Sequence, residues 1–188
     1  MAYRINIFEL AGISVLSGAT RGQQFLSKLI STARRAGQPE PLFLDFAGID
    51  LMTSSFFRAG LLPFRNYCVE KLGLYPVLAN ISEDTLDEID LVLAPIRDAV
   101  ILCRLNAKER VSEARIFGIL DEKQRLTFEA VVEAKEADAG ILKHRFRKSD
   151  EIGITGWNNR LAALVAKGLL IETPKGRGKV YRPVLELS

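Results

Sequence analysis

The chain has 188 residues, of which 48% are hydrophobic and 26% charged, and its formal net charge is +3. This composition is typical of a folded globular protein rather than a disordered one, and the length is enough for two small domains. The chain has no apolar run of about 18 residues and does not begin like a signal peptide, so we expect a cytoplasmic protein with no membrane partner.

Residues 1–105 alternate between strand-like and helix-like segments, which predicts an α/β domain. Strands are expected at 4–10, 13–16 (as the partner of the first), 42–46, 75–79 and 99–104. Helices are expected at 22–35, from Thr53 onward and from Ser82 onward, and Pro63 should kink the second of them. Cys68 and Cys103 lie in apolar stretches and are expected to be reduced core residues, with no metal or disulfide role.

The segment from Leu44 to Phe57, together with the helix that begins near Thr20, resembles the STAS domains of anti-sigma-factor antagonists. It is more similar to the STAS-like family of unassigned function that occurs in bacterial regulatory proteins. This resemblance covers residues 3–105 and implies a domain that binds a signal or a protein partner. Such a partner would be a histidine-kinase-like ATPase or a sigma- or anti-sigma-type regulator.

The same resemblance places Ser55 at the position of the serine that a partner kinase phosphorylates. A phosphate there would lie in the first turn of a helix, where backbone N–H groups and the helix dipole favour it. This sequence has Thr53 and Phe56 where the family has aspartate and glycine. The alternative is that Thr53 and Ser54 cap the helix and Ser55 has no role in regulation.

Residues 106–113 are expected to be a linker, and residues 114–188 a second domain of three helices and a hairpin. The first helix should span 121–136 with Leu126 on its apolar face, and Asp138 should cap the second. Thr155 should cap a third helix that runs to about residue 167 and ends at Gly168. Two β-prone runs, 169–173 and 180–184, should form a hairpin around the loop 174–179.

Residues 154–164, followed by 167–170, resemble the recognition-helix region of bacterial winged helix-turn-helix regulators. The resemblance covers about residues 114–187. The predicted fold is therefore an α/β STAS-like domain followed by a winged helix-turn-helix domain of α+β type.

The faces of the third helix have different compositions. Trp157 lies on the apolar side and is expected in the core rather than on a nucleic acid. The other side offers small and amide side chains that suit a DNA major groove. Candidate DNA contacts on this helix are Thr155, Asn158, Asn159 and Arg160.

Basic residues are concentrated near the C-terminus. Residues 143–183 contain ten basic and three acidic side chains, whereas residues 1–112 contain twelve of each. Such asymmetry favours a polyanionic partner. Lys175, Arg177 and Lys179 in the expected wing are the candidate backbone contacts; the alternative is a solvated turn.

No catalytic constellation, cofactor motif or metal-ligand cluster is found in the sequence, so neither an enzyme nor a cofactor is expected. The favoured interpretation is a bacterial transcription regulator that binds duplex DNA, with assembly as a homodimer left open. The alternative is a protein-interaction module of a phosphorylation-controlled partner-switching system, in which the winged helix docks a protein.

Overall fold

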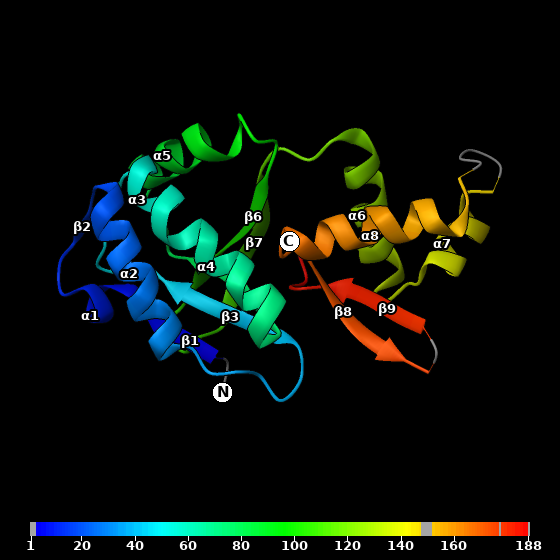
Figure 1. Cartoon of the computed structure of the whole chain (residues 1–188), viewed down its shortest axis with the longest axis horizontal. Helices are drawn as coiled ribbons and strands as arrows, with labels where there is room; N and C mark the ends of the chain where they lie inside the picture. The colour runs from blue at the N-terminus through cyan, green and yellow to red at the C-terminus, as the bar shows by residue number, and fades with distance from the viewer. Residues whose placement is uncertain (1–2, 148–151, 177, 188) are drawn as a thin grey trace.

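A computed structural model describes residues 3–147, 152–176 and 178–187. Figure 1 shows two lobes side by side, an N-terminal lobe of residues 3–118 and a C-terminal lobe of residues 119–187. The chain is therefore mixed α and β in both halves.

The N-terminal lobe is built on a sheet with the strand order β1-β3-β5-β6-β7. The first four strands run parallel, and β7 pairs with β6 in the antiparallel direction. The bounds are β1 (Tyr3–Asn6), β3 (Glu40–Asp45), β5 (Leu74–Ala79), β6 (Ala99–Leu105) and β7 (Val111–Gly118). A separate short pair consists of β2 (Val15–Leu16) and β4 (Leu51–Met52).

Helices cover one face of this sheet. They are α1 (Ile7–Ala11), α2 (Ala19–Thr32), α3 (Ser54–Phe56), α4 (Leu62–Tyr67) and α5 (Glu83–Leu93), with π-helical turns η1 (Phe57–Leu61) and η2 (Cys68–Leu72). The α2 backbone touches the helical segment 54–72, because a Cβ on Gly22 would lie 2.8 Å from the Phe56 carbonyl oxygen. A Cβ on Gly60 would lie 2.8 Å from the Gly22 carbonyl oxygen, so both positions need glycine.

Pro63 lies inside a helical segment that continues from Ser54 to Leu72. Proline has no N–H to donate to the preceding turn. The helical turn just before Pro63 is wider than an α-helical turn, because the Leu62 N–H donates to the carbonyl of Phe57, five residues earlier. Pro63, where a kink was predicted, is thus directly preceded by a π-helical turn.

The first predicted strand is too long. It ends at Asn6, because the Asn6 side chain accepts a hydrogen bond from the Glu9 N–H and caps α1. The predicted partner at 13–16 is also wrong, since Val15 and Leu16 pair with Leu51 and Met52 rather than with β1.

The expected linker, residues 106–113, is a turn followed by the start of a strand of the sheet. The Asn106 side chain accepts hydrogen bonds from the N–H groups of Lys108 and Arg110, which turns the chain back along β6. Strand β7 then begins at Val111, so the lobe extends to Gly118 rather than to residue 105.

The C-terminal lobe contains α6 (Glu122–Ala134), α7 (Ala139–Arg145), α8 (Ile154–Ala166), β8 (Leu170–Lys175) and β9 (Gly178–Pro183). Asp138 caps α7, as predicted, and Asp121, expected in the first turn of its helix, is the N-cap of α6. Leu126, predicted on the buried face of α6, is 37% exposed. Thr127 is buried there instead, because its hydroxyl donates to the Lys123 carbonyl and needs no solvent.

Two further boundaries differ from the prediction. The N-cap of α8 is Gly153, and Thr155 lies within the first turn. The hairpin strands extend through most of the expected loop, since Lys175 pairs directly with Gly178. Lys175 and Lys179 therefore lie on strands.

The second face of the sheet packs against the C-terminal lobe. Tyr75, Ala99 and Ile101 belong to the same buried cluster as Leu169 and Leu170. The sheet therefore contributes to two cores, one of which it shares with the other lobe.

An ion triad crosses the boundary between the lobes; Asp98 and Arg65 are buried and Lys167 is partly buried. Asp98, immediately before β6, accepts from Arg65 of α4 at 2.7 Å and from Lys167, the C-cap of α8, at 3.2 Å. The Lys167 ammonium also donates to the Arg97 carbonyl at 2.6 Å. The end of α8 is therefore attached to the N-terminal lobe.

Candidate nucleic-acid interface

Helix α8 is held by one buried face. Trp157, Leu161 and Leu164 are fully buried against α6 and α7. The helix ends where Gly168 adopts a φ of 74°, as predicted for this glycine. The exposed face carries only small or uncharged side chains, namely Thr155, Asn158, Asn159, Ala162 and Ala166.

Trp157 is a core residue, as the sequence predicted. Its ring lies 5.2 Å from that of Phe146, measured between centroids, and the Arg160 guanidinium lies 4.8 Å from its centroid. The indole N–H has no hydrogen-bond partner among the residues that the structure describes. Trp157 thus joins the end of α7 to the start of α8.

Arg160 is half-buried over this ring. A guanidinium in that position is attracted by the negative face of the indole. Of the predicted contacts on α8, Arg160 therefore has a structural role, whereas Thr155, Asn158 and Asn159 lie together on the exposed face.

The two lysines of the hairpin that the structure describes each pair with a glutamate of their own lobe. Lys175 contacts Glu136 at 2.8 Å, and Lys179 contacts Glu172 at the same distance. The hydrogen bond and charge of Glu136 raise the pKa of Lys175, and those of Glu172 raise the pKa of Lys179. Arg177 lies outside the described residues.

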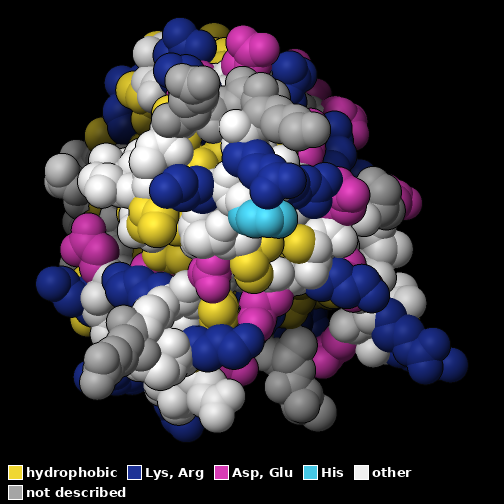
Figure 2. Space-filling model, turned by 90° about the vertical axis from the view of Figure 1, so that its right-hand side faces the viewer, with side chains coloured by type: hydrophobic (Ala, Val, Ile, Leu, Met, Phe, Trp, Pro, Cys, Tyr) yellow, Lys and Arg dark blue, Asp and Glu magenta, His cyan; other side chains and the backbone are white. Residues whose placement is uncertain are grey.

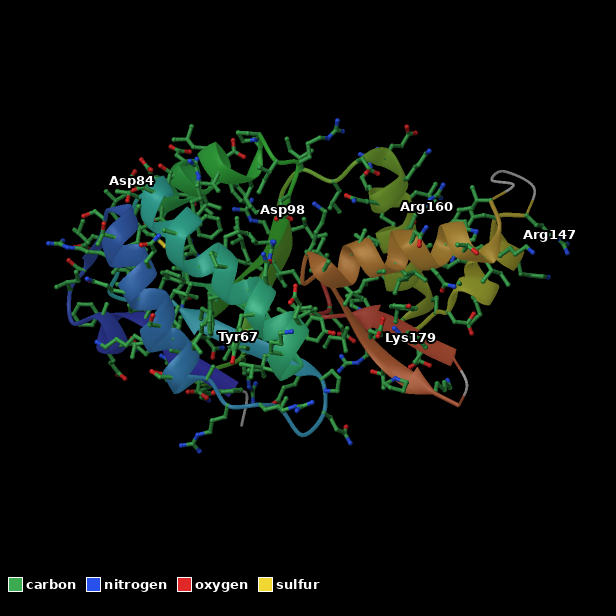
Figure 3. All side chains as sticks on the ribbon, in the orientation of Figure 1. Tyr67, Asp84, Asp98, Arg147, Arg160 and Lys179 are labelled. Atoms are coloured by element: carbon green, nitrogen blue, oxygen red, sulfur yellow. The ribbon has the colours of Figure 1, made fainter. Side chains whose placement is uncertain are left out.

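A second basic group lies at the outer end of the lobe. We call Lys143, His144, Arg145 and Arg147 the α7 basic surface; all four are exposed. Figure 2 faces this end and shows Lys and Arg side chains gathered around the histidine. Figure 3 shows Arg147 at this outer end and Lys179 on the hairpin. The basic run 143–148 in the sequence was the signal for this surface, but none of these residues was among the predicted DNA contacts.

Ser55 lies at the other end of the molecule, at the start of the segment 54–72. Its hydroxyl is 3.2 Å from that of Thr53. Thr53 occupies the N-cap position without a side-chain capping bond, and Glu88 of α5 instead accepts from the Ser54 N–H at 2.6 Å. The predicted cap by Thr53 or Ser54 is therefore wrong, because a carboxylate from another helix takes that place.

The described residues also bear on metal binding, thiol chemistry and membrane insertion. No group of three or more potential ligands that could hold a metal ion occurs among the described residues. Cys68 and Cys103 are buried, and burial raises the pKa of each thiol to about 12, so both stay protonated. Within the same residues, no helix combines the length and apolarity that crossing a membrane requires.

We also compared the chain with protein-family models, with curated proteins and with solved structures, and none of the three comparisons gave a match.

Proposed function

We propose that the chain is a DNA-binding transcription regulator. Its C-terminal lobe would act as a winged helix that binds duplex DNA, and its N-terminal lobe as a STAS-like unit that receives a signal or a protein partner. The observation that carries this proposal is the uncharged, small-residue face of α8, beside which the same lobe holds the α7 basic surface and a lysine-bearing hairpin.

The exposed face of α8 suits a major groove. Ala162 and Ala166 leave the helix narrow there, and the groove of B-DNA, about 12 Å wide, admits a helix. Asn158 and Asn159 carry amides, which bind adenine edges through paired hydrogen bonds. Bases would therefore be recognised by neutral side chains and phosphates by the cations around them.

The ion pairs of the hairpin are compatible with this function. Lys175 and Lys179 are exposed, and an exposed ion pair contributes only about 0–1 kcal/mol. Replacing Glu136 or Glu172 by a DNA phosphate therefore costs little free energy. The hairpin can act as a secondary contact.

The direct test uses the full chain and a set of labelled duplexes at several salt concentrations. We expect the logarithm of the binding constant to fall linearly with the logarithm of the salt concentration, because phosphate contacts release counterions. Absence of binding to any duplex at low salt, by protein shown to be folded, would reject the proposal.

The second candidate is a protein-interaction module of a phosphorylation-controlled partner-switching system, in which the winged helix docks a protein rather than DNA. It is favoured by one observation, the exposed hydroxyl of Ser55 at the start of a helical segment. Glu88 argues against it, because its carboxylate already occupies that helix start and would repel a phosphate.

Phosphorylation can be tested by mass spectrometry of the native protein and by the variant Ser55→Asp. If the serine is a switch, phosphate is found on it, and the variant changes binding of a partner or the oligomeric state. Ser31→Asp, at an exposed serine near the end of α2, is the matched control. An unmodified Ser55 and unchanged assembly would remove this candidate.

A further inference from the structure

The α7 basic surface differs from the hairpin in how its cations are held. Among the described residues, no carboxylate pairs with Lys143 or Arg147, whereas Lys175 and Lys179 each have a glutamate at 2.8 Å. Arg145 pairs with Glu133, and Arg147 lies 3.5 Å from the His144 ring nitrogen. The positive charges of Lys143 and Arg147 therefore have no carboxylate partner among the described residues, and both side chains are exposed to solvent.

These cations are fixed relative to α8 by aromatic packing. Phe146, between Arg145 and Arg147 in the chain, stacks on Trp157 of α8, and the Arg145 guanidinium lies 5.7 Å from the Phe146 centroid. Leu142 of α7 is fully buried in the same core. The backbone that carries the α7 basic surface is therefore packed against α8.

The surface also includes large apolar side chains. Ile141 of α7 and Ile154, the first residue of α8, are each 49% exposed. Yellow side chains lie among the blue ones on this end in Figure 2. A mixed surface of cations and isoleucines can contact both the phosphates and the sugars of a nucleic-acid backbone.

We propose that the α7 basic surface, rather than the hairpin, is the main phosphate-binding surface of this protein. The inference rests on the proposed function, since its ligand is the backbone of the duplex whose bases α8 contacts. Phosphates bind Lys143 and Arg147 without first displacing a described carboxylate, whereas at Lys175 and Lys179 they must replace Glu136 and Glu172. The α7 basic surface therefore provides the larger part of the salt-dependent affinity.

The test compares three double variants of the full chain, each of which removes two positive charges. Lys143→Gln with Arg147→Gln changes the α7 basic surface, and Lys175→Gln with Lys179→Gln changes the hairpin. Arg34→Gln with Arg35→Gln, exposed after α2 in the N-terminal lobe, is the control. The readout is the slope of log affinity against log salt on one duplex, with thermal melting to check the fold.

We expect the α7 variant to lose affinity on the order of tenfold near 0.1 M salt, and its slope to fall by about 1.8, because each phosphate contact contributes about 0.9. The hairpin variant should lose less than half of this, and the control should match the unaltered chain. A larger loss in the hairpin variant, or an equal loss in the control, would overturn the inference alone. No binding by the unaltered chain would overturn the proposed function as well.

Discussion

At the scale of single residues, Trp157 supports the candidate interface from the core rather than from its surface. It is fully buried between α7 and α8, under the Arg160 guanidinium. We expect Trp157→Ala to lower the free energy of unfolding by about 3–5 kcal/mol, because the substitution leaves a large cavity. Trp157→Phe should cost less, since it keeps much of the volume and removes an indole N–H that lacks a described partner.

Urea unfolding of both Trp157 variants measures this difference, with DNA binding followed in parallel. A Trp157→Ala protein of unchanged stability that no longer binds DNA would contradict the assignment. In that case the ring itself would contact the nucleic acid.

Asp98 is the residue with the clearest pH dependence. Burial tends to raise its pKa, but the hydrogen bond and charge of Arg65, the Ala99 N–H and the charge of Lys167 hold the pKa below its ordinary value. A carboxyl whose pKa is lower in the folded state stabilises the fold above its unfolded pKa of about 3.9 and loses this contribution as the pH falls below it. The unaltered chain should thus lose stability below about pH 4 in part through this group.

Asp98→Asn tests this directly. We expect a loss of about 3 kcal/mol at pH 7, because the buried Arg65 and the partly buried Lys167 would be left without a counter-charge. The difference between the variant and the unaltered chain should shrink as the pH approaches 3. Glu113→Gln, which removes the exposed partner of Arg104 at 3.9 Å, should change stability by less than about 1 kcal/mol at any pH. Unfolding curves that stay parallel from pH 7 to 3 would show that Asp98 does not act in this way.

At the scale of elements, prediction succeeded where the signal was local. Asp121, Asp138 and Gly168 mark helix ends through their own side chains or backbone, and these ends are observed. Prediction failed where a polar residue had two uses. The pattern around Asn6 predicts a continuing strand, but its side chain caps α1. Asn106 was predicted in a linker, but its side chain stabilises the turn that leads into β7.

The part of the candidate interface that could be predicted follows the same rule. Helical spacing placed Trp157 in the core and Asn159 on the exposed face, as observed. Spacing could not show that Lys175 and Lys179 would pair with Glu136 and Glu172, because the first pair joins residues 39 positions apart in the chain. Nor could it show that Arg160 would cover Trp157.

Helix α8 gives the sharpest prediction about base recognition. We expect Asn159→Ala to cost about 1–3 kcal/mol of binding free energy at one base pair and to relax preference there, because an amide that reads a base edge is lost. Gln24→Ala, which removes an exposed amide from α2, is the matched control. The test is binding to a set of duplexes that each differ by one base pair. A uniform loss of affinity on all duplexes would show that Asn159 contacts the DNA backbone instead.

At the scale of the whole molecule, the shared core should make the two lobes unfold together. Trp157 is the only tryptophan and reports on the C-terminal lobe, while the thiols of Cys68 and Cys103 are buried in the N-terminal lobe. Tryptophan fluorescence and thiol labelling should therefore give the same urea midpoint. Lys167→Ala should separate the two midpoints, because it breaks the triad at the boundary. Separate transitions in the unaltered chain would show that the lobes are independent.

No local sequence pattern predicts the ion triad at the boundary between the lobes, because Lys167 and Asp98 are 69 positions apart. The boundary also limits how the protein can be recombined. A different sheet joined to residue 119 would have to supply a carboxylate opposite Lys167 and an apolar cover for Leu169 and Leu170. A substitution at Asp98 or Lys167 on one side of the boundary therefore needs a compensating substitution on the other, so the two lobes are not exchangeable parts.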